Sequence, residues 1–389
     1  MKILLVNKAY YPHLGGVETV VRQIAEGMLK RGHETTVLCF GERDVTETIA
    51  GVEVHRIRPI GRIGSAPVKF RFVTEFSKLS KRVDVINFHS PNPMGEISFL
   101  LCPSARKKGV KIVCTYQGDA QKPRFLLPIY DFILKRFFRL CDVIAVSNPP
   151  LSENSRVLKT GSNKDKLLII PLGVRAENYS KHLPSDIDEA RRLLTHLPSS
   201  SFKVMYAGRM VYYKGLEVLL KAMKAMKEKG LPVSAFLVGS GPEEYDIKNF
   251  IINNAMEKEI LILPHQPEGV YRALFSLADC FVLPSTHQTE AFGIVLTEAM
   301  ASGLPIISTE LGTGTSWINR DGETGIVVPP RNPNALAEAV AYLANHEVER
   351  KAMATKSLAN ARRFFEEEMM LDAYDEVFRT ITNLPHLCS

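Results

Sequence analysis

Short apolar runs recur along the whole chain and alternate with stretches of helical periodicity. The first half contains KILLVN, TTVLCF, VDVINF, KIVCTY and DVIAVS, and the second half contains FKVMYAG, SAFLVG, EILIL, CFVLP and PIIST. Runs this short and this apolar are typical of parallel strands that are buried on both faces. The alternation predicts an α/β protein with two doubly wound, Rossmann-like domains, whose ligand lies in a cleft at the carboxyl ends of both sheets.

A polar, proline-containing stretch at about 175–200 separates the two sets of strands, and we expect it to be linker and loop. The predicted domains are therefore 1–175 and 176–365. The remaining residues, 366–389, begin with apolar side chains at helical spacing. This spacing predicts a last helix that is able to pack on either domain.

The composition is that of an ordinary globular protein, with 389 residues, enough for two sizeable cores. The sequence predicts no membrane span, and its first residues, MKILLVN, turn polar too soon for a secretory signal. The cysteines are scattered, so we expect buried free thiols in a reducing, cytoplasmic compartment and no structural zinc. They are Cys39, Cys102, Cys114, Cys141, Cys280 and Cys388.

The net charge of +7 is unevenly distributed between the two predicted domains. Residues 1–175 contain 28 Lys and Arg against 15 Asp and Glu, a net charge of +13, whereas the rest of the chain carries −6. A basic domain favours an anionic partner. Nucleic acid is one candidate, and an anionic membrane surface is the other.

The segment E-A-F-G-I-V-L-T-E-A-M places two carboxylates around a glycine and a run of good helix formers. If the helix begins near Phe292 or Gly293, Glu290 lies just before its N-terminus and Glu298 lies in the second turn. The free backbone N–H groups of 292–296 would then face an anion such as a pyrophosphate. The alternative is an exposed pair of surface acids, but the apolar neighbours predict burial.

Arg209 and Lys214 flank the turn between the first strand of the second domain and its helix. Cations beside a helix N-terminus are badly placed for the helix dipole but well placed to neutralise a diphosphate. The alternative is a solvated surface pair.

Two glycine turns also follow strands. Gly15 and Gly16 allow close approach of a phosphate, or else form a tight turn that needs a positive φ. Gly239 and Gly241 resemble half of a dinucleotide fingerprint without its third glycine, so a turn is the default interpretation there.

Four further features carry weaker signals. His89 ends a strand at the predicted cleft, with a satisfied structural histidine as the alternative. His265 also follows a strand but gives no comparable signal. The segment 129–140 mixes aromatic and basic residues, which suits either a membrane interface or a helix that packs on the sheet. The basic run 106–108 is typical of a solvated helix end, and Asp186-Ile187-Asp188 of a surface loop that binds no metal.

Taken together, these segments resemble glycosyltransferase family 4, whose members are retaining enzymes of the GT-B architecture. The resemblance covers nearly the whole chain in the family's order, and the E-x7-E segment with the upstream R-x4-K is its most specific part. The segment 115–122 is similar to that of bacterial polysaccharide and O-antigen mannosyltransferases. The matching segments are G-G-V-E-T-V-V (15–21), F-H-S-P-N-P (88–93), T-Y-Q-G-D-A-Q-K (115–122), P-L-G-V (171–174), G-R-M-V-Y-Y-K-G (208–215), V-G-S-G-P-E (238–243) and E-A-F-G-I-V-L-T-E-A-M-A-S-G-L-P (290–305).

The resemblance implies a role for each matching residue. Arg209 and Lys214 would hold the donor diphosphate, Glu290 would contact hydroxyls of the transferred sugar, and Glu298 would contact the ribose. His89 would lie near the reaction centre and form the catalytic set with Glu290, Arg209 and Lys214. Further donor-binding positions are expected at Gly15, Gly16, Gln117, Gly208, Gly239, His265, Ala291, Phe292, Gly293, Ile294 and Leu296.

One residue departs from the family's pattern. Gln117 stands where family members usually have a histidine beside the donor sugar and phosphate. Glutamine forms hydrogen bonds but carries no positive charge, so the departure bears on rate or donor choice. The resemblance also implies that the last helix, within 366–389, crosses back onto the first domain.

The implied activity is transfer of a hexose, with mannose favoured, from GDP-mannose or a UDP-hexose to a hydroxyl of a lipid-linked glycan in bacterial cell-surface polysaccharide or lipopolysaccharide synthesis. Arg209, Lys214 and helix N-termini would stabilise the leaving diphosphate in place of a metal, and no cofactor is expected. We expect a peripheral enzyme at the inner face of the cytoplasmic membrane. The alternatives are a sugar-nucleotide epimerase of similar fold and a non-catalytic, degenerate member.

Overall fold

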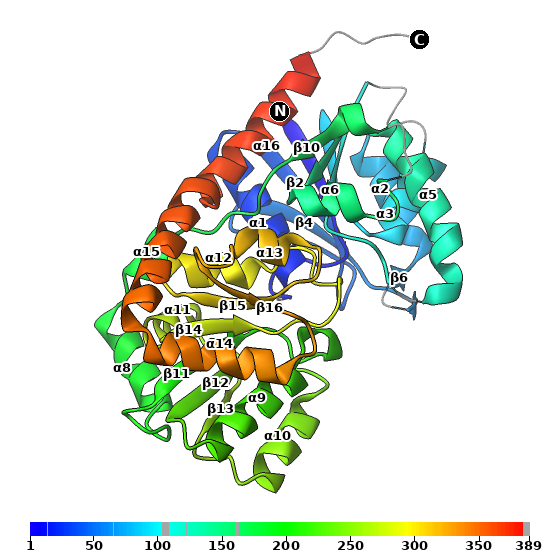
Figure 1. Ribbon diagram of the computed structural model, residues 1–389. Helices are drawn as coiled ribbons and strands as arrows, with labels where there is room; N and C mark the ends of the chain where they lie inside the picture. Colours follow the sequence, from blue (N-terminus) through cyan, green and yellow to red (C-terminus); the bar gives the residue numbers. More distant parts are fainter. Residues whose placement is uncertain (14, 65, 103–108, 122, 160–162, 384–389) are drawn as a thin grey trace. The chain divides into compact units, whose positions relative to one another are not determined.

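The computed structural model describes residues 1–389 except 14, 65, 103–108, 122, 160–162 and 384–389 (Figure 1). The chain forms two compact units. The first comprises Met1–Leu172 with Glu367–Ser389, and the second comprises Gly173–Glu366. The boundaries therefore lie within a few residues of the predicted 175 and 365, and the last helix belongs to the first unit.

The first unit is built on a sheet with the strand order β10-β9-β8-β7-β1-β2-β4-β3. All neighbouring strands are parallel except β3 and β4, which form an antiparallel hairpin. The chain runs outward from β1 in one direction and from β7 in the other, so the strand order reverses between these two strands. The strands are β1 (Lys2–Val6), β2 (Glu34–Phe40), β3 (Val45–Ile49), β4 (Val52–Ile57), β7 (Val85–Ser90), β8 (Lys111–Tyr116), β9 (Val143–Val146) and β10 (Leu167–Ile169).

Helices of the first unit pack their apolar faces on this sheet. Edge-to-face contacts among Phe88 of β7, Phe99 of α3 and Phe137 of α5 lie at the centre of the core. Aromatic pairs in this geometry add stability beyond the area that they bury. The helices are α1 (Gly16–Lys30), α2 (Phe70–Leu79), α3 (Pro93–Leu101), α5 (Leu127–Leu140) and α6 (Pro149–Asn154), and a short hairpin is formed by β5 (Gly61–Ile63) and β6 (Ala66–Val68).

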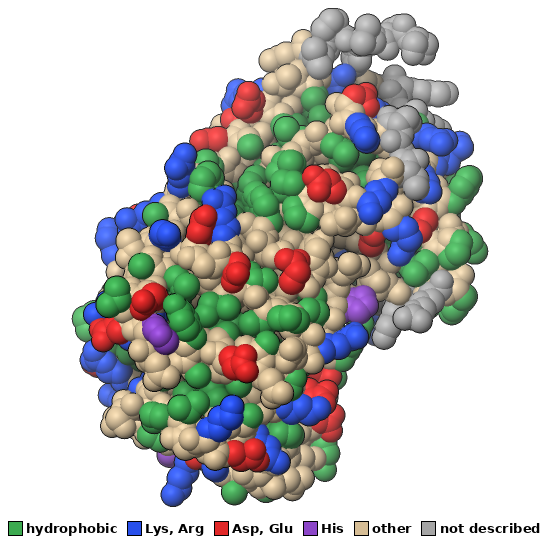
Figure 2. All heavy atoms as spheres, viewed as in Figure 1, with side chains coloured by type: hydrophobic (Ala, Val, Ile, Leu, Met, Phe, Trp, Pro, Cys, Tyr) green, Lys and Arg blue, Asp and Glu red, His purple; other side chains and the backbone are tan. Residues whose placement is uncertain are grey.

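Helix α5 corresponds to the mixed aromatic and basic segment of the sequence. Its buried side chains include Tyr130, Leu134 and Phe137, so the packing interpretation of this segment is confirmed. The opposite face exposes apolar groups: Ile129 is 61% exposed and Phe132 is 69% exposed. Hydrophobic side chains gather on the surface over α5, with Lys and Arg beside them (Figure 2).

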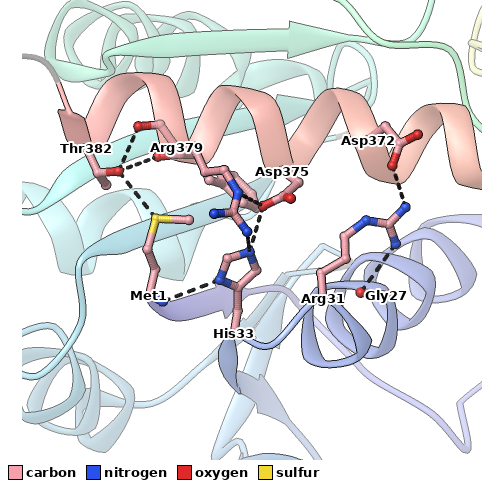
Figure 3. Close-up of polar contacts among 9 residues, drawn as sticks. Met1, Gly27, Arg31, His33, Asp372, Asp375, Arg379 and Thr382 are labelled. Carbon is pink, nitrogen blue, oxygen red and sulfur yellow. Dashed lines mark hydrogen bonds and ion pairs between the residues drawn. The ribbon is translucent and has the colours of Figure 1, made fainter.

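The last helix, α16 (Glu367–Asn383), packs along α1 of the first unit through both apolar and polar contacts. A Cβ at Gly27 would lie only 2.5 Å from Leu371, so glycine permits the close approach of the two helices. Arg31 forms an ion pair with Glu368. It forms a second with Asp372, and His33 Nε2 lies 2.6 Å from Asp375 Oδ1 (Figure 3). The helical spacing alone allowed this helix to pack on either domain, and in the structure it belongs to the first unit.

The second unit contains a parallel sheet with the order β13-β12-β11-β14-β15-β16. Its strand order reverses between β11 and β14. The strands are β11 (Phe202–Ala207), β12 (Val233–Val238), β13 (Ile260–Leu263), β14 (Cys280–Leu283), β15 (Ile306–Thr309) and β16 (Gly325–Val328). The helices are α7 (Glu177–Ser180), α8 (Pro184–Leu193), α9 (Leu216–Glu228), α10 (Glu244–Asn253), α11 (Glu268–Ser276), α12 (Ile294–Ala301), α13 (Gly314–Ile318), α14 (Pro333–Asn345) and α15 (Glu347–Phe364).

The predicted linker at 175–200 is wrong. This stretch forms α7 and α8, and both helices pack on α11 within the second unit. Pro184 occupies the first turn of α8, where a missing N–H costs nothing, so the proline starts a helix instead of breaking one. The Asp186-Ile187-Asp188 motif consequently lies in the first two turns of α8 and not in a loop. Within the described part of the chain, no three His, Cys, Asp or Glu side chains are grouped so as to hold a metal.

Candidate active site

The Glu290–Glu298 segment adopts the predicted geometry. Helix α12 begins at Ile294 after Gly293, which has φ 80°, so Glu290 precedes the helix and Glu298 lies in its second turn. At the other end, Gly303 has φ 71° and the N–H of Leu304 donates to the Ala299 carbonyl at 3.0 Å. This is the glycine-terminated helix end that the sequence predicted.

Glu290 pairs with Lys214, the lysine that the resemblance assigns to the donor diphosphate. Lys214 Nζ lies 2.5 Å from Glu290 Oε2, and both side chains are close to nine-tenths buried. Ser285 Oγ donates to the same carboxylate oxygen at 3.3 Å. An ammonium has three donor hydrogens, so Lys214 retains donors for a second anion while Glu290 holds it in place.

Threonines of the neighbouring loop fix the backbone around Glu290. Thr313 Oγ1 donates to the Glu290 carbonyl at 2.7 Å, and Thr309 Oγ1 donates to the Ser285 carbonyl at 2.5 Å. The N–H of Gly314 donates to the Ala291 carbonyl at 2.9 Å. These positioning residues were not predicted, because nothing in the local sequence marks a threonine that bonds to a distant loop.

Arg209 follows β11 and has an exposed side chain. Its guanidinium makes no hydrogen bond or ion pair with the described residues, whereas its carbonyl accepts a hydrogen bond from Tyr206 at 3.1 Å. Lys214 ends a 3-10 turn, η3 (Tyr212–Lys214), directly before α9. The two cations therefore differ: Lys214 is paired and buried, and Arg209 is unpaired and exposed.

The glycines of the second unit are required by close backbone packing. A Cβ at Gly239 would collide with the Gly208 carbonyl, and one at Gly241 would collide with the Met210 carbonyl. Gly208 and Gly239 also have φ of 146° and 137°. These positions therefore need glycine to bring two strand ends together, as the turn interpretation holds.

Glu298 is held by two tyrosines. Tyr271 donates to Glu298 Oε2 at 2.7 Å, and the hydroxyl of Tyr179, from α7, donates to the same carboxylate. Burial raises the pKa of Glu298, while these hydrogen bonds and the Arg272 charge act in the opposite direction. Tyr179 lies in the stretch that was predicted as linker, so no role was predicted for it.

Two predicted donor-binding residues are placed differently from the others. The N–H of Leu296 donates to the Gly293 carbonyl at 2.8 Å and its side chain is fully buried, so the prediction of a free N–H at this position is wrong. The first turn of α12 closes on itself at this point. His265 is exposed and follows β13, the edge strand, which β12 separates from β11.

In the first unit, His89 lies near the carboxyl end of β7 and is 1% exposed. Neither of its ring nitrogens has a hydrogen-bond partner among the described residues. Burial lowers the pKa of His89 to about 3, so the imidazole is neutral at ordinary pH. Among the described residues, His89 therefore lacks the partners that a satisfied structural histidine would have.

Gln117 follows β8, next to the end of β7. Its N–H donates to the Ser90 carbonyl at 2.8 Å, while its buried Nε2 finds no partner in the described part of the chain. Ser90 Oγ in turn donates to Glu96 at 2.6 Å.

Glu96, in the first turn of α3, is completely buried and was not singled out by the sequence. It accepts hydrogen bonds from Ser90 Oγ, from the Asn92 N–H at 2.7 Å and from the Tyr130 hydroxyl at 2.9 Å. Burial raises the pKa of Glu96, while the hydrogen bonds from these three donors act in the opposite direction. Glu96 thereby fixes the segment that carries His89.

The first glycine turn does not follow the tight-turn interpretation. Gly15 has φ 178°, which is extended backbone, and Gly16 begins α1 without a positive φ. The space beside Gly15 is taken by the Glu18 carboxylate, which a Cβ would meet.

Among the remaining predictions, Cys388 and the basic run 106–108 lie outside the described residues, whereas the other five cysteines are free.

The architecture of both units, with parallel sheets and helices on their faces, is that of a GT-B glycosyltransferase. The structure of Anabaena Alr3699/HepE in complex with UDP superimposes with a TM-score of 0.77 at 21% identity, over 98% of this chain and 100% of the other. The GT-B fold with two Rossmann-like domains, predicted from the sequence, is confirmed.

Sequence comparison identifies the family. Residues 14–178 match the model for Glycosyltransferase Family 4, and residues 192–359 match that for glycosyl transferases group 1. O-antigen chain mannosyltransferase C of Escherichia coli is 32% identical over 98% of this chain and 99% of its own length. D-rhamnosyltransferase WbpZ of Pseudomonas aeruginosa is 30% identical over 94% of this chain and 92% of its own length. The chain belongs to glycosyltransferase family 4 and is a hexosyltransferase.

Proposed function

We propose that this enzyme moves a hexose, with mannose favoured, from a nucleotide-diphosphate sugar to a glycan hydroxyl in bacterial cell-surface polysaccharide synthesis, with retention of configuration. The buried Lys214–Glu290 pair beside the unpaired Arg209 carries this proposal. Among the relatives, one is named a mannosyltransferase of an O-antigen chain and the other a D-rhamnosyltransferase. The first of these names favours a mannosyl donor, and therefore GDP-mannose before a UDP-hexose.

In the proposed complex, Lys214 and Arg209 neutralise the diphosphate as it leaves. Lys214 sits directly before α9, whose N-terminal N–H groups also favour negative charge. Because Glu290 already holds the ammonium in place, little reorganisation accompanies the development of charge on the phosphate. The other oxygen of Glu290 remains to accept hydrogen bonds from hydroxyls of the transferred sugar.

In the proposed reaction, the bond between the anomeric carbon and the diphosphate oxygen breaks while the acceptor oxygen bonds to the same face. The proton of the acceptor hydroxyl passes to the departing phosphate oxygen. Neither glutamate is assigned a nucleophilic role, since Glu290 is paired with Lys214 and Glu298 accepts from two tyrosines. Neutral His89 is proposed to hydrogen-bond near the reaction centre without exchanging a proton.

A panel of sugar nucleotides, scored by thermal shift, tests the donor assignment. A true donor binds only the folded state and raises the melting temperature, by mass action. NMR of the product formed with that donor gives the configuration at the anomeric carbon. An inverted product contradicts the mechanism, and a new sugar-nucleotide isomer formed without acceptor contradicts transfer altogether.

We propose further that the acceptor is lipid-linked and that the first unit contacts an anionic membrane. None of the described helices is long and apolar enough to cross a bilayer. The exposed face of α5 and the preceding turn presents Phe125, Ile129 and Phe132 near Lys135, Arg136 and Arg139, within residues 1–175, which carry a net charge of +13. Apolar groups flanked by cations favour the surface of an anionic bilayer.

Vesicle sedimentation at low salt tests the membrane assignment. The wild-type enzyme should sediment with vesicles of phosphatidylglycerol and phosphatidylcholine and remain in solution with phosphatidylcholine alone. The double substitution Ile129→Ser, Phe132→Ser should weaken sedimentation, whereas Ile252→Ser, at an exposed position of α10 in the second unit, should not. Equal sedimentation of all three proteins contradicts the assignment to α5.

A further inference from the structure

Several side chains at the carboxyl end of the first sheet have hydrogen-bonding groups that nothing in the described chain satisfies. Both ring nitrogens of His89, both amide atoms of Asn92 and Nε2 of Gln117 are buried without a partner. Buried polar groups are paired in the great majority of native structures, so each such group calls for an explanation. Their concentration in one place indicates a ligand that is rich in hydrogen-bonding groups.

These side chains lie side by side where the strand order reverses. Val6 of β1 is in register with Phe88 of β7, and Ser90 of β7 is in register with Tyr116 of β8. A Cβ at Gly95 would lie 2.9 Å from Asn92 Nδ2 and 3.1 Å from Val6 Cγ1, which puts the Asn92 amide against the end of β1. Ligands of open α/β sheets bind at such a reversal point.

Lys8 completes this group, and no motif pointed to it. It leaves the carboxyl end of β1, is partly buried, and its ammonium makes no hydrogen bond or ion pair with any described residue. Burial lowers its pKa, and the charges of Glu96 and Glu18 raise it. Glu96 already accepts from Ser90, Asn92 and Tyr130, so its hydrogen-bonding capacity is largely used.

The chemistry of the group matches sugar hydroxyls better than a phosphate. Asn92 offers an acceptor as well as a donor, neutral His89 does the same, and the carboxylates near Lys8 repel an anion. A sugar hydroxyl both donates and accepts, and an ammonium binds it by a charge-assisted hydrogen bond. In the second unit, by contrast, Lys214, Glu290 and Glu298 are already paired with one another or with tyrosines.

We propose that Lys8 and Asn92 form a subsite for the hydroxyls of the acceptor sugar. The proposal rests on the proposed function, because it assigns the donor to the second unit and the second substrate to the first. It makes Lys8 and Asn92 determinants of which sugar receives the transferred hexose. It also explains why a buried asparagine side chain has no internal partner.

Ligand-observed NMR with a panel of methyl hexosides, including mannose, glucose, galactose and N-acetylglucosamine, tests the subsite on the full chain. At least one hexoside should give a saturable signal with the wild-type protein. Lys8→Met keeps the apolar stem and removes the ammonium, so the Kd for that hexoside should rise about tenfold or more. Lys2→Met, at the exposed opposite end of β1, is the matched control and should bind as the wild type does.

Asn92→Ala provides a second, independent variant. Its side chain has no hydrogen bond to lose, so the melting temperature should stay close to that of the wild type while hexoside affinity falls. If Asn92 has a purely structural role, the melting temperature should fall while the hexoside affinity stays close to that of the wild type. The proposal is overturned if no hexoside binds to the wild type, or if both variants bind it normally.

Thermal shift by sugar nucleotides on the same variants separates this proposal from the proposed function. Lys8→Met and Asn92→Ala should retain the shift produced by the donor. Loss of that shift would assign the two residues to the donor and overturn the proposal. Conversely, hexoside binding without any donor shift in the wild type leaves the subsite standing and contradicts the donor assignment.

Discussion

The two units present polar groups at their sheet ends in opposite ways. In the second unit, Lys214 pairs with Glu290 and Glu298 accepts from two tyrosines, so these three charged groups, unlike the exposed Arg209, are fixed by the protein itself. In the first unit, His89, Asn92 and Gln117 are buried with no partner among the described residues. The contrast indicates that charge stabilisation is preorganised in the second unit, whereas the first unit reserves its hydrogen bonds for substrate.

Breaking the pair in the second unit should have the largest effect. Lys214→Ala removes the buried cation and leaves Glu290 without its partner, so kcat should fall about 10²–10³-fold, as for other preorganised charge donors. Steady-state kinetics with the identified donor measure this. Lys221→Ala, in the exposed i,i+4 pair of α9, is the control. Full activity in Lys214→Ala would remove the basis of the proposed function.

Substitution of Glu96 tests whether this hydrogen-bonded carboxylate holds in place the segment that carries the unpaired side chains of the first unit. Glu96→Ala leaves the donors of Ser90, Asn92 and Tyr130 without an acceptor, so the free energy of unfolding should fall by about 3 kcal/mol. Urea denaturation measures it, and Glu34→Ala, an exposed member of a surface pair, should change little. If Glu96→Ala is as stable as the wild type, Glu96 does not position this segment.

The burial of His89 predicts a pH dependence of stability. The pKa is about 3 in the folded chain and about 6.5 when unfolded, so the unfolded chain binds the extra proton between these values. The contribution of neutral His89 to the free energy of unfolding is fully present above about pH 6.5 and is lost as the pH falls toward 3. Between pH 7 and pH 5 the wild type should lose about 2 kcal/mol more than His89→Gln. If urea denaturation shows the same loss in free energy of unfolding for the wild type and His89→Gln, then His89 is not buried as a neutral group.

The smallest effect is expected at the tyrosine that supports Glu298. Tyr179→Phe removes one donor to the carboxylate while keeping the ring, so stability should fall by about 1 kcal/mol and donor affinity by less than tenfold. Denaturation and donor thermal shift measure the two quantities. Tyr245→Phe, at an exposed position of α10, should leave both unchanged. No change in Tyr179→Phe would mean that Glu298 is held by Tyr271 alone.

Most of the parallel strands and the main helices of the second unit could be predicted, because buried apolar runs and helical periodicity are local signals. The β3–β4 hairpin was missed although V-T-E-T-I and V-E-V-H-R-I alternate and meet at Ala50-Gly51, both with positive φ. The stretch 175–200 was misassigned because Pro184 was interpreted as a breaker when it starts a helix. Both errors concern signals that have two structural meanings until packing selects one.

The sequence by itself determined the parallel α/β architecture, the placement of Glu290 and Glu298 around the start of one helix, and the two cations beside another. These features follow from periodicity and helix-end residues, which act over a few positions. Only the tertiary structure decided that Lys214 pairs with Glu290, that Tyr179 supports Glu298, that α16 joins the first unit, and that the side chains of His89 and Asn92 are buried with no partner among the described residues. Pairing between distant segments and the burial of polar groups depend on how strands are ordered in a sheet, and no local pattern encodes that order.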